Sequence, residues 1–224
     1  SHMGSDLTVV NSARVSFGNQ KTELDKRDRK LIRYLIAHKH TSTLEHCVVT
    51  YKFTVPLYIR SQHHRHRTWS YNEISRRYTE KDLQFYCPRE FRTQHKSNRQ
   101  ASNVEEMVDP LLWHQEGTQV VRAFHPPASE IYREHCLHSL RLFEELVNKG
   151  VCREQARGVL PQTLYTEYYG TVNLGNLLKF VSLRIHEGAQ YEIQKVAEAC
   201  LEIASDLFPV TVKSYRASIN NGKV

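Results

Sequence analysis

The run QHHRHRTWSYNEISRRY at 62–78 constrains the fold of this chain more than any other stretch. It holds four arginines and three histidines, and a folded protein keeps so many cationic groups together only at a cost unless an anion lies among them. A solvated basic face is the simpler interpretation. A binding site is favoured because Asn72 and Glu73 supply hydrogen-bond partners suited to ribose, while Ser75 beside Arg76 and Arg77 can share one phosphate. We therefore predict a double phosphate site.

The same run resembles the signature of a known family. Its residues match the pattern RHRxxSxNExSxRY of the flavin-dependent thymidylate synthases at Arg65-His66-Arg67, Ser70, Asn72-Glu73, Ser75 and Arg77-Tyr78. The similarity extends from the ARVSF segment at 13–17 to the AQYEI segment at 189–193. It therefore covers nearly the whole chain except the middle.

The resemblance implies an activity. Family members carry out the reductive methylation of dUMP to dTMP in de novo thymidylate biosynthesis, with FAD as hydride carrier, methylenetetrahydrofolate as carbon donor and NADPH as reductant. They are homotetramers whose sites combine several subunits. Uracil C5 is a poor nucleophile, so such an enzyme needs cationic donors at the uracil edge. Arg184 matches the family position that carries out this catalytic role, although an arginine near a helix end is more commonly only a favourable charge.

The resemblance also implies which residues bind the ligands. The positions matched to dUMP binding are Gln62, Arg65, Glu73, Ser75, Arg76, Arg77, Arg157 and Arg184. The positions matched to FAD binding are His40, Ser42, Arg65, His66, Arg67, Glu73 and Asn173. Three positions depart from the family pattern, with Arg76 in place of a small residue, Lys179 in place of asparagine and Gly188 in place of histidine.

Composition bounds the class of protein. A chain of 224 residues with 40% hydrophobic content suits one domain, which we place at 4–224, with 1–3 interpreted as a tag remnant. The net charge of +7 favours anionic partners. Five cysteines without a CxxC pair argue against a disulfide framework or a metal site and favour a reducing cytoplasm. The apolar runs are shorter than the ~20 residues of a membrane span, so we expect no membrane association.

Hydrophobic periodicity predicts the elements. Helices are expected at 25–38, 57–64, 129–148, 173–186 and 190–208, with a brief helix from Val151 that carries Arg153 and Arg157. A half-buried strand is expected at 47–55. Segment 13–17 is interpreted as a buried turn, 89–102 as a mobile loop, and Ser102-x-x-Glu105 as a capping box that opens a helix.

These elements predict an α+β fold with a small, mainly antiparallel sheet covered by helices, because helices outnumber strands and do not alternate regularly with them. The chain lacks the GxGxxG and GxxxxGK[ST] phosphate-binding patterns, so arginines must hold the phosphates. Tyr165, Tyr168 and Tyr169 are interpreted as core or interface residues rather than as a stacking platform for bases.

Two other functions are compatible with parts of the sequence. A nucleic-acid-binding module would explain the charge, but its basic residues should spread along one groove-facing element, whereas here they alternate with Asn72 and Glu73. We therefore expect no nucleic-acid partner. A flavin reductase without methyl transfer would keep the FAD-binding residues but has no use for Ser75, Arg77 and Arg157.

Overall fold

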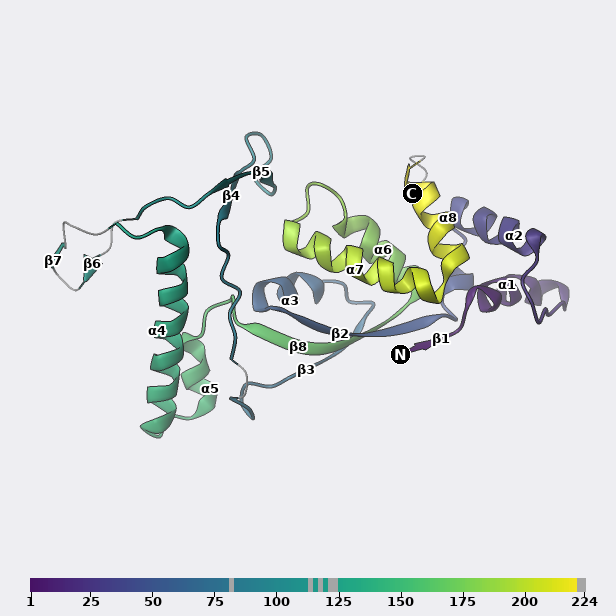
Figure 1. Cartoon of the computed structure of the whole chain (residues 1–224). Coiled ribbons are helices and arrows are strands. Elements are labelled where there is room, and N and C mark those ends of the chain that lie inside the picture. The colour runs from purple at the N-terminus through teal and green to yellow at the C-terminus, as the bar shows by residue number, and fades with distance from the viewer. Residues whose placement is uncertain (81–82, 113–114, 117–118, 121–124, 221–224) are drawn as a thin grey trace. The chain divides into compact units, whose positions relative to one another are not determined.

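The computed structural model describes residues 1–80, 83–112, 115–116, 119–120 and 125–220 (Figure 1). Residue contacts divide the chain into two compact units. Unit 1 comprises Ser1–Phe53, Gln62–Asn72 and Tyr168–Val224, and unit 2 comprises Thr54–Ser61 and Glu73–Glu167. The assignment of 4–224 to one domain stays a prediction.

The elements confirm the α+β class. The helices are α1 (Asp6–Arg14), α2 (Lys26–Ala37), α3 (Leu57–His63), α4 (Ala128–Asn148), α5 (Arg153–Ala156), α6 (Leu174–Arg184), α7 (Tyr191–Leu207) and α8 (Pro209–Asn220), with short 3-10 turns η1 (Val15–Phe17), η2 (Thr41–Leu44) and η3 (Arg157–Val159). The strands are β1 (His2–Met3), β2 (Val48–Pro56), β3 (Ser70–Glu73), β4 (Phe91–Gln94), β5 (Ser102–Val108), β6 (Gln115–Glu116), β7 (Gln119–Val120) and β8 (Tyr165–Asn173).

Within the described residues, the strands form small sheets. The main sheet has the order β1-β2-β8-β3, and two-stranded sheets pair β4 with β5 and β6 with β7. Strands β2 and β8 run antiparallel, since Thr50 bonds to Thr171 and Thr54 bonds to Glu167. His2 and Met3, interpreted as part of a tag remnant, pair with β2 at the sheet edge.

Strand β2 supplies the buried face of unit 1. Val49, Tyr51 and Phe53 are buried, as the alternation of apolar residues predicts, while the residues between them are partly or fully exposed. The Tyr51 hydroxyl donates a hydrogen bond of 3.0 Å to the carbonyl of Cys200 on α7. Helix α7 therefore lies over β2, as Figure 1 shows.

The C-terminal end of unit 1 contains a helix that periodicity did not predict. Helix α7 ends at Leu207, and α8 begins at Pro209, whose fixed φ suits the first position of a helix. Buried Asp6 accepts hydrogen bonds from the backbone N–H groups of Val210 at 2.8 Å and Thr211 at 2.9 Å. A carboxylate 204 residues away in sequence thus caps α8 and complements its dipole.

The prediction of a helix after Ser102 is wrong. Segment Ser102–Val108 is strand β5, and it pairs antiparallel with β4, which lies inside the stretch interpreted as a loop. The Ser102 hydroxyl accepts a 2.9 Å hydrogen bond from Arg92 Nε on β4, so pairing with a distant segment engages the oxygen that a helix cap would use. A capping-box spacing alone therefore misidentified the first residue of a strand.

The interpretation of 13–17 as a buried turn is also wrong. Ala13 and Arg14 end helix α1, and the following turn η1 leaves Val15 73% and Phe17 80% exposed. Arg14 pairs with the buried carboxylate of Asp28 on α2 at 2.6 Å, which draws the arginine toward the helices and leaves the next turn outside.

Helix α4 differs from its prediction only at its start. Its N-cap residue is Pro127, and the predicted cap Ser129 lies in the first turn. The Ser129 hydroxyl donates to Asp109 Oδ2 at 2.6 Å instead of capping the helix. Helix α4 packs beside α5, as Figure 1 shows, and their buried core includes Phe143 and Leu160.

Candidate functional site

Each unit contains a pocket that holds some of the predicted ligand-binding residues. The arginine pocket, in unit 2, has a volume of about 750 Å³ and is lined by Leu57, Arg60, Glu73, Ile74, Ser75, Arg76, Arg77, Glu154, Arg157, Gly158, Leu160, Gln162, Leu164 and Thr166. The helix pocket, in unit 1, has a volume of about 500 Å³ and is lined by Leu35, Ile36, Lys39, His40, Thr41, Leu44, Glu45, Asn173, Gly175, Asn176, Leu178, Lys179, Ser182 and Tyr215.

The arginine pocket gathers cations from separate parts of the sequence. Arg76 and Arg77 follow the end of β3, and Arg157 begins the turn η3. The Arg76 guanidinium donates to the carbonyl of Tyr165 at 3.2 Å, and the backbone N–H of Arg77 donates to the Ser75 hydroxyl at 3.3 Å. Forked guanidinium donors converging on one cavity form a receptor for a phosphate group.

Glu73 is held in this pocket by two partners. Its Oε1 atom accepts a 2.7 Å hydrogen bond from the Thr166 hydroxyl and pairs with Arg60 Nε at 3.2 Å. Both contacts fix the carboxylate, because a hydroxyl from β8 and a guanidinium from α3 approach the same oxygen. Glu73 can therefore accept hydrogen bonds from a sugar or a base without having to reorient.

The helix pocket begins where α2 ends. Lys39 has a positive φ of 55°. Its N–H donates to the carbonyl of Ile36 at 3.1 Å, and the N–H of His40 donates to that of Leu35 at 2.9 Å, which together form a Schellman motif. A non-glycine residue in this conformation costs about 1–2 kcal/mol. This chain turn carries Lys39 and His40 into the pocket wall.

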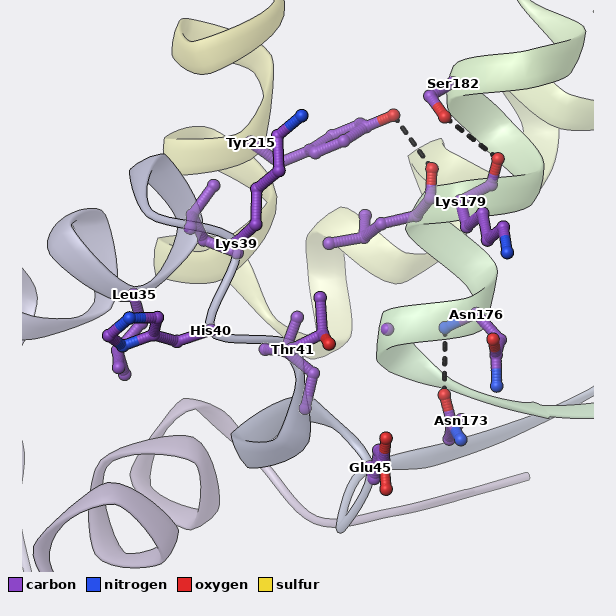
Figure 2. A pocket seen from close by; sticks show the side chains of 14 residues that line it. Leu35, Lys39, His40, Thr41, Glu45, Asn173, Asn176, Lys179, Ser182 and Tyr215 are labelled. Carbon is purple, nitrogen blue, oxygen red and sulfur yellow. Dashed lines mark hydrogen bonds between the residues drawn. The ribbon is translucent and has the colours of Figure 1, made fainter. Parts of the chain in front are cut away.

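Helix α6 forms the facing wall of the helix pocket, which Figure 2 shows with Asn176, Lys179 and Ser182 along it. Asn173 caps this helix by accepting a 2.9 Å hydrogen bond from the N–H of Asn176. The Tyr215 hydroxyl donates to the carbonyl of Leu178 at 2.9 Å and braces α6 from α8.

The lining of the helix pocket suits a flavin dinucleotide. Apolar side chains can pack against flat rings, while lysine and amide groups in the lining suit phosphates and ring heteroatoms. The apolar lining residues are Leu35, Ile36, Leu44 and Leu178, and the polar ones include Lys39, His40, Asn173, Asn176 and Lys179. The residues that line the helix pocket therefore fit FAD, the cofactor that the sequence predicts.

Arg184 lies at the end of α6 and makes a specific contact. Its Nε atom donates a 3.0 Å hydrogen bond to His66 Nε2. A guanidinium has no acceptor, so His66 must present a lone pair at Nε2 and carry its proton on Nδ1. Arg184 is therefore held by a neutral imidazole rather than by a carboxylate.

Two histidines of the 62–78 run have strongly shifted pKa values. Burial, followed by repulsion from His66, His64 and Arg184, lowers the pKa of His63 to about 3. Burial, followed by repulsion from Arg184 and Lys179, lowers the pKa of His66 to about 4. Both imidazoles are neutral at neutral pH, and His63 Nδ1 lies 2.8 Å from the Tyr168 hydroxyl within an aromatic cluster.

These shifts predict an acid-sensitive fold. Between pH 6.5 and about 4 these histidines bind protons in the unfolded chain but stay neutral in the folded protein. The free energy of unfolding should therefore fall as the pH falls. The slope contributed by buried His63 is about 1.4 kcal/mol per pH unit, and half-buried His66 should add less. Denaturant unfolding at several pH values measures the slope. His63→Asn should reduce it, His138→Asn on the exposed face of α4 should not, and equal slopes in both variants would contradict the assignment.

Several predicted ligand-binding residues lie outside the lining of both pockets. Arg65 and Arg67 are exposed on the turns after α3, and Ser42 is exposed within η2. The Gln62 side chain donates to that of Gln190, ahead of α7. The structure thus groups Glu73, Ser75, Arg76, Arg77 and Arg157 in one pocket, His40 and Asn173 in the other, and His66 with Arg184.

Sequence reasoning missed three residues that shape these pockets. Arg60 and Thr166 orient Glu73, and Lys39 faces the helix pocket. The sequence held a weak signal for Lys39, because helices commonly end with a residue in the left-handed conformation and no glycine follows this helix. The sequence held no signal for Arg60 and Thr166, because their contacts with Glu73 form only in the tertiary structure.

Among the described residues, no group of three or more His, Cys, Asp or Glu side chains is arranged to hold a metal ion. In the same part of the chain, every helix is too short or too polar to cross a membrane.

Comparison with known proteins decides the family. A family model described as "Thymidylate synthase complementing protein" matches residues 1–210. The chain is 38% identical over 220 residues to the flavin-dependent thymidylate synthase of Thermus thermophilus, which covers 98% of this chain and 75% of that protein. The chain belongs to the flavin-dependent thymidylate synthase family. The family resemblance predicted from the RHRxxSxNExSxRY pattern is thereby confirmed.

Other members and a solved structure agree. The flavin-dependent thymidylate synthase of Kosmotoga olearia is 37% identical over 213 residues, covering 95% of this chain and 86% of that one. The crystal structure of a UMP/dUMP methylase, PolB, from Streptomyces cacaoi bound with 5-Br UMP matches with a TM-score of 0.74 and 33% identity, covering 97% of this chain and 91% of that one. The α+β fold of this flavin-dependent thymidylate synthase family member is therefore shared with a nucleotide methylase.

Proposed function

We propose that this protein converts dUMP to dTMP by reductive methylation, with FAD as cofactor, methylenetetrahydrofolate as carbon donor and NADPH as reductant. Membership of the flavin-dependent thymidylate synthase family supports the reaction. The observation that carries the proposal is the arginine pocket, where Arg76, Arg77 and Arg157 line a cavity together with Glu73 and Ser75. That combination suits a nucleoside monophosphate.

The arginine pocket is proposed to hold the nucleotide. Arg77 and Arg157 bind the phosphate by charge-assisted hydrogen bonds, and the Ser75 hydroxyl adds a neutral donor. Glu73, fixed by Thr166 and Arg60, accepts a hydrogen bond from the nucleoside part. Arg76 has one donor committed to the Tyr165 carbonyl, so it supports the chain around the phosphate more than it binds the phosphate itself.

The helix pocket is proposed to hold part of the FAD. When bound, FAD supplies the hydride chemistry that the side chains of this protein cannot supply. His40, Asn173 and Lys179 offer polar contacts at the pocket wall, and the apolar residues exclude water from the rings. The exposed residues Ser42, Arg65 and Arg67 are proposed to contact FAD as well, although they lie outside this pocket.

Arg184 is proposed as the catalytic residue. We propose that its guanidinium stabilises the negative charge drawn toward the uracil N3 and O4 atoms during attack by C5. The guanidinium stays protonated although burial lowers its pKa. Gln62 is proposed to position the uracil ring from the end of α3.

Two further properties belong to the proposal. We infer a homotetramer, supported by family membership and by the number of exposed arginines in the 62–78 run. We infer a cytoplasmic location, supported by the absence of a cysteine pattern suited to a disulfide framework. Sedimentation of the flavin-loaded protein measures the assembly, and an active monomer would contradict it.

A direct assay tests the proposed reaction. Purified protein is supplied with dUMP, methylenetetrahydrofolate and NADPH, and dTMP is quantified by chromatography while the flavin spectrum is recorded. We expect a flavin spectrum that bleaches with NADPH and reoxidises with formation of dTMP. NADPH oxidation without dTMP would support the flavin reductase instead. A parallel assay with UMP decides whether the substrate is the ribonucleotide, as the name of the Streptomyces cacaoi methylase makes possible.

A further inference from the structure

We propose that His66 is a positioning residue for catalysis, because its imidazole accepts the Nε–H of Arg184 and fixes the plane of that guanidinium. The inference rests on the proposed function and extends it. His66 matches a flavin-binding position of the family, and in the structure its side chain also accepts a hydrogen bond from Arg184.

The donor and acceptor atoms determine what the contact does. Arg184 uses its Nε atom, at 3.0 Å from His66 Nε2, so the two terminal Nη nitrogens remain available for a substrate. Because the guanidinium is planar, a hydrogen bond at Nε restricts its rotation and keeps the two Nη donors together in one fixed plane. Two aligned donors can stabilise adjacent acceptors on a pyrimidine edge more effectively than a freely rotating side chain.

Packing explains why the imidazole stays in place. Its ring meets the ring of Phe180 edge to face, with centroids 4.8 Å apart and planes at 88°. Phe180 is fully buried on α6, one turn before Arg184 on the same helix. The backbone N–H of His66 donates to the carbonyl of His63 at 2.9 Å. One helix therefore carries both the residue that orients His66 and the residue that His66 orients.

Electrostatics selects a neutral acceptor at this place. Among the described residues, Arg184 and Lys179 are the cations that raise the positive potential at the His66 imidazole, the ring of His63 lies 6.3 Å away, and the Tyr71 hydroxyl donates to the His66 carbonyl at 3.1 Å. A carboxylate would form a tighter pair with Arg184 and would withdraw positive charge from the substrate. A neutral imidazole orients the guanidinium and leaves its full charge for the reaction.

The first test compares two substitutions at this position. His66→Gln can place its Oε1 atom near the position of Nε2, so at equal flavin content it should lower kcat less than a variant without an acceptor. His66→Leu removes the acceptor at similar volume and should lower kcat by about tenfold to one hundredfold, with a smaller effect on the KM for dUMP. Both variants are assayed at saturating FAD, and their bound flavin is measured, so that loss of cofactor is separated from loss of turnover.

A double-mutant cycle with Arg184→Ala decides the mechanism. If His66 acts through Arg184, His66→Leu should lower turnover strongly in the wild-type background and hardly at all in the Arg184→Ala background. Equal fold-decreases in both backgrounds, or a His66→Gln variant as slow as His66→Leu at equal flavin content, would overturn the inference. Absence of dTMP formation by the unmodified protein would instead contradict the proposed function.

Discussion

Replacing Arg184 with alanine should lower kcat for dTMP formation by about two to three powers of ten, while the protein stays folded and binds FAD. The loss is expected because Arg184 is proposed to stabilise charge that develops on the uracil ring only during reaction. As a simple charge at the C-terminus of α6 it would contribute about 0.3–1 kcal/mol to stability, and turnover would stay nearly unchanged. The two roles therefore differ by a measurable factor.

Arg184→Lys should recover little of this activity. Lysine keeps the charge but has no atom equivalent to Nε, so the contact with His66 Nε2 is lost together with the planar pair of donors. The measurement is the rate of dTMP formation at saturating dUMP, beside flavin content and Tm. Arg33→Ala, at an exposed position on α2 of the same unit, is the matched control and should be unaffected. Near-normal turnover in Arg184→Ala would assign the residue to the helix-end role.

The sequence predicts those parts of the fold that have local causes. Strand β2 and helices α2, α6 and α7 carry regular apolar periodicity, and their boundaries lie within one or two residues of the predictions. Strand β5 and helix α8, in contrast, are stabilised by residues that lie elsewhere in the chain. Strand β5 depends on pairing with β4, and the start of α8 depends on the carboxylate of Asp6. The spacing of residues within a segment does not reveal partners that lie elsewhere in the chain.

Strand β8 shows how an aromatic run can be interpreted correctly and yet incompletely. Tyr168 is buried and Tyr169 is 56% exposed, because successive side chains of a strand point to opposite faces. The prediction that these tyrosines serve packing rather than base stacking describes Tyr168. The strand itself was not predicted, because the sequence at 165–173 does not alternate between apolar and polar residues, although burial alternates along it in the structure.

For the candidate site, the motif predicted which residues matter, and tertiary structure determines how they are held. Arg157 is distant in sequence from the neighbouring pair Arg76 and Arg77, yet all three line one cavity. Their common cavity was inferred only from family resemblance, since charge patterning alone equally suits an exposed basic face. The contact between His66 and Arg184 spans 118 positions, and no spacing rule connects them.

Replacing Arg77 with alanine should weaken dUMP binding by about tenfold to one hundredfold and leave FAD binding nearly unchanged. The reason is the loss of a charge-assisted contact to phosphate, which contributes about 1.5–3 kcal/mol, with the lower end expected because Arg77 is exposed. The Arg77 guanidinium contacts Tyr78, both through a 3.2 Å hydrogen bond to the hydroxyl and over the ring. The phosphate therefore competes with a contact that is weak and solvated.

Deoxyuridine, which lacks the phosphate, provides the sharpest comparison. Arg77→Ala should weaken dUMP binding but not deoxyuridine binding, measured by calorimetry at low and moderate salt, because only the phosphate contact is lost. The dUMP deficit should shrink as salt rises, since screening weakens the wild-type contact first. Arg141→Ala, at an exposed position on α4, is the matched control for removal of one positive charge from unit 2. Equal losses for dUMP, deoxyuridine and FAD would show that Arg77 supports the fold of the arginine pocket and does not bind the phosphate.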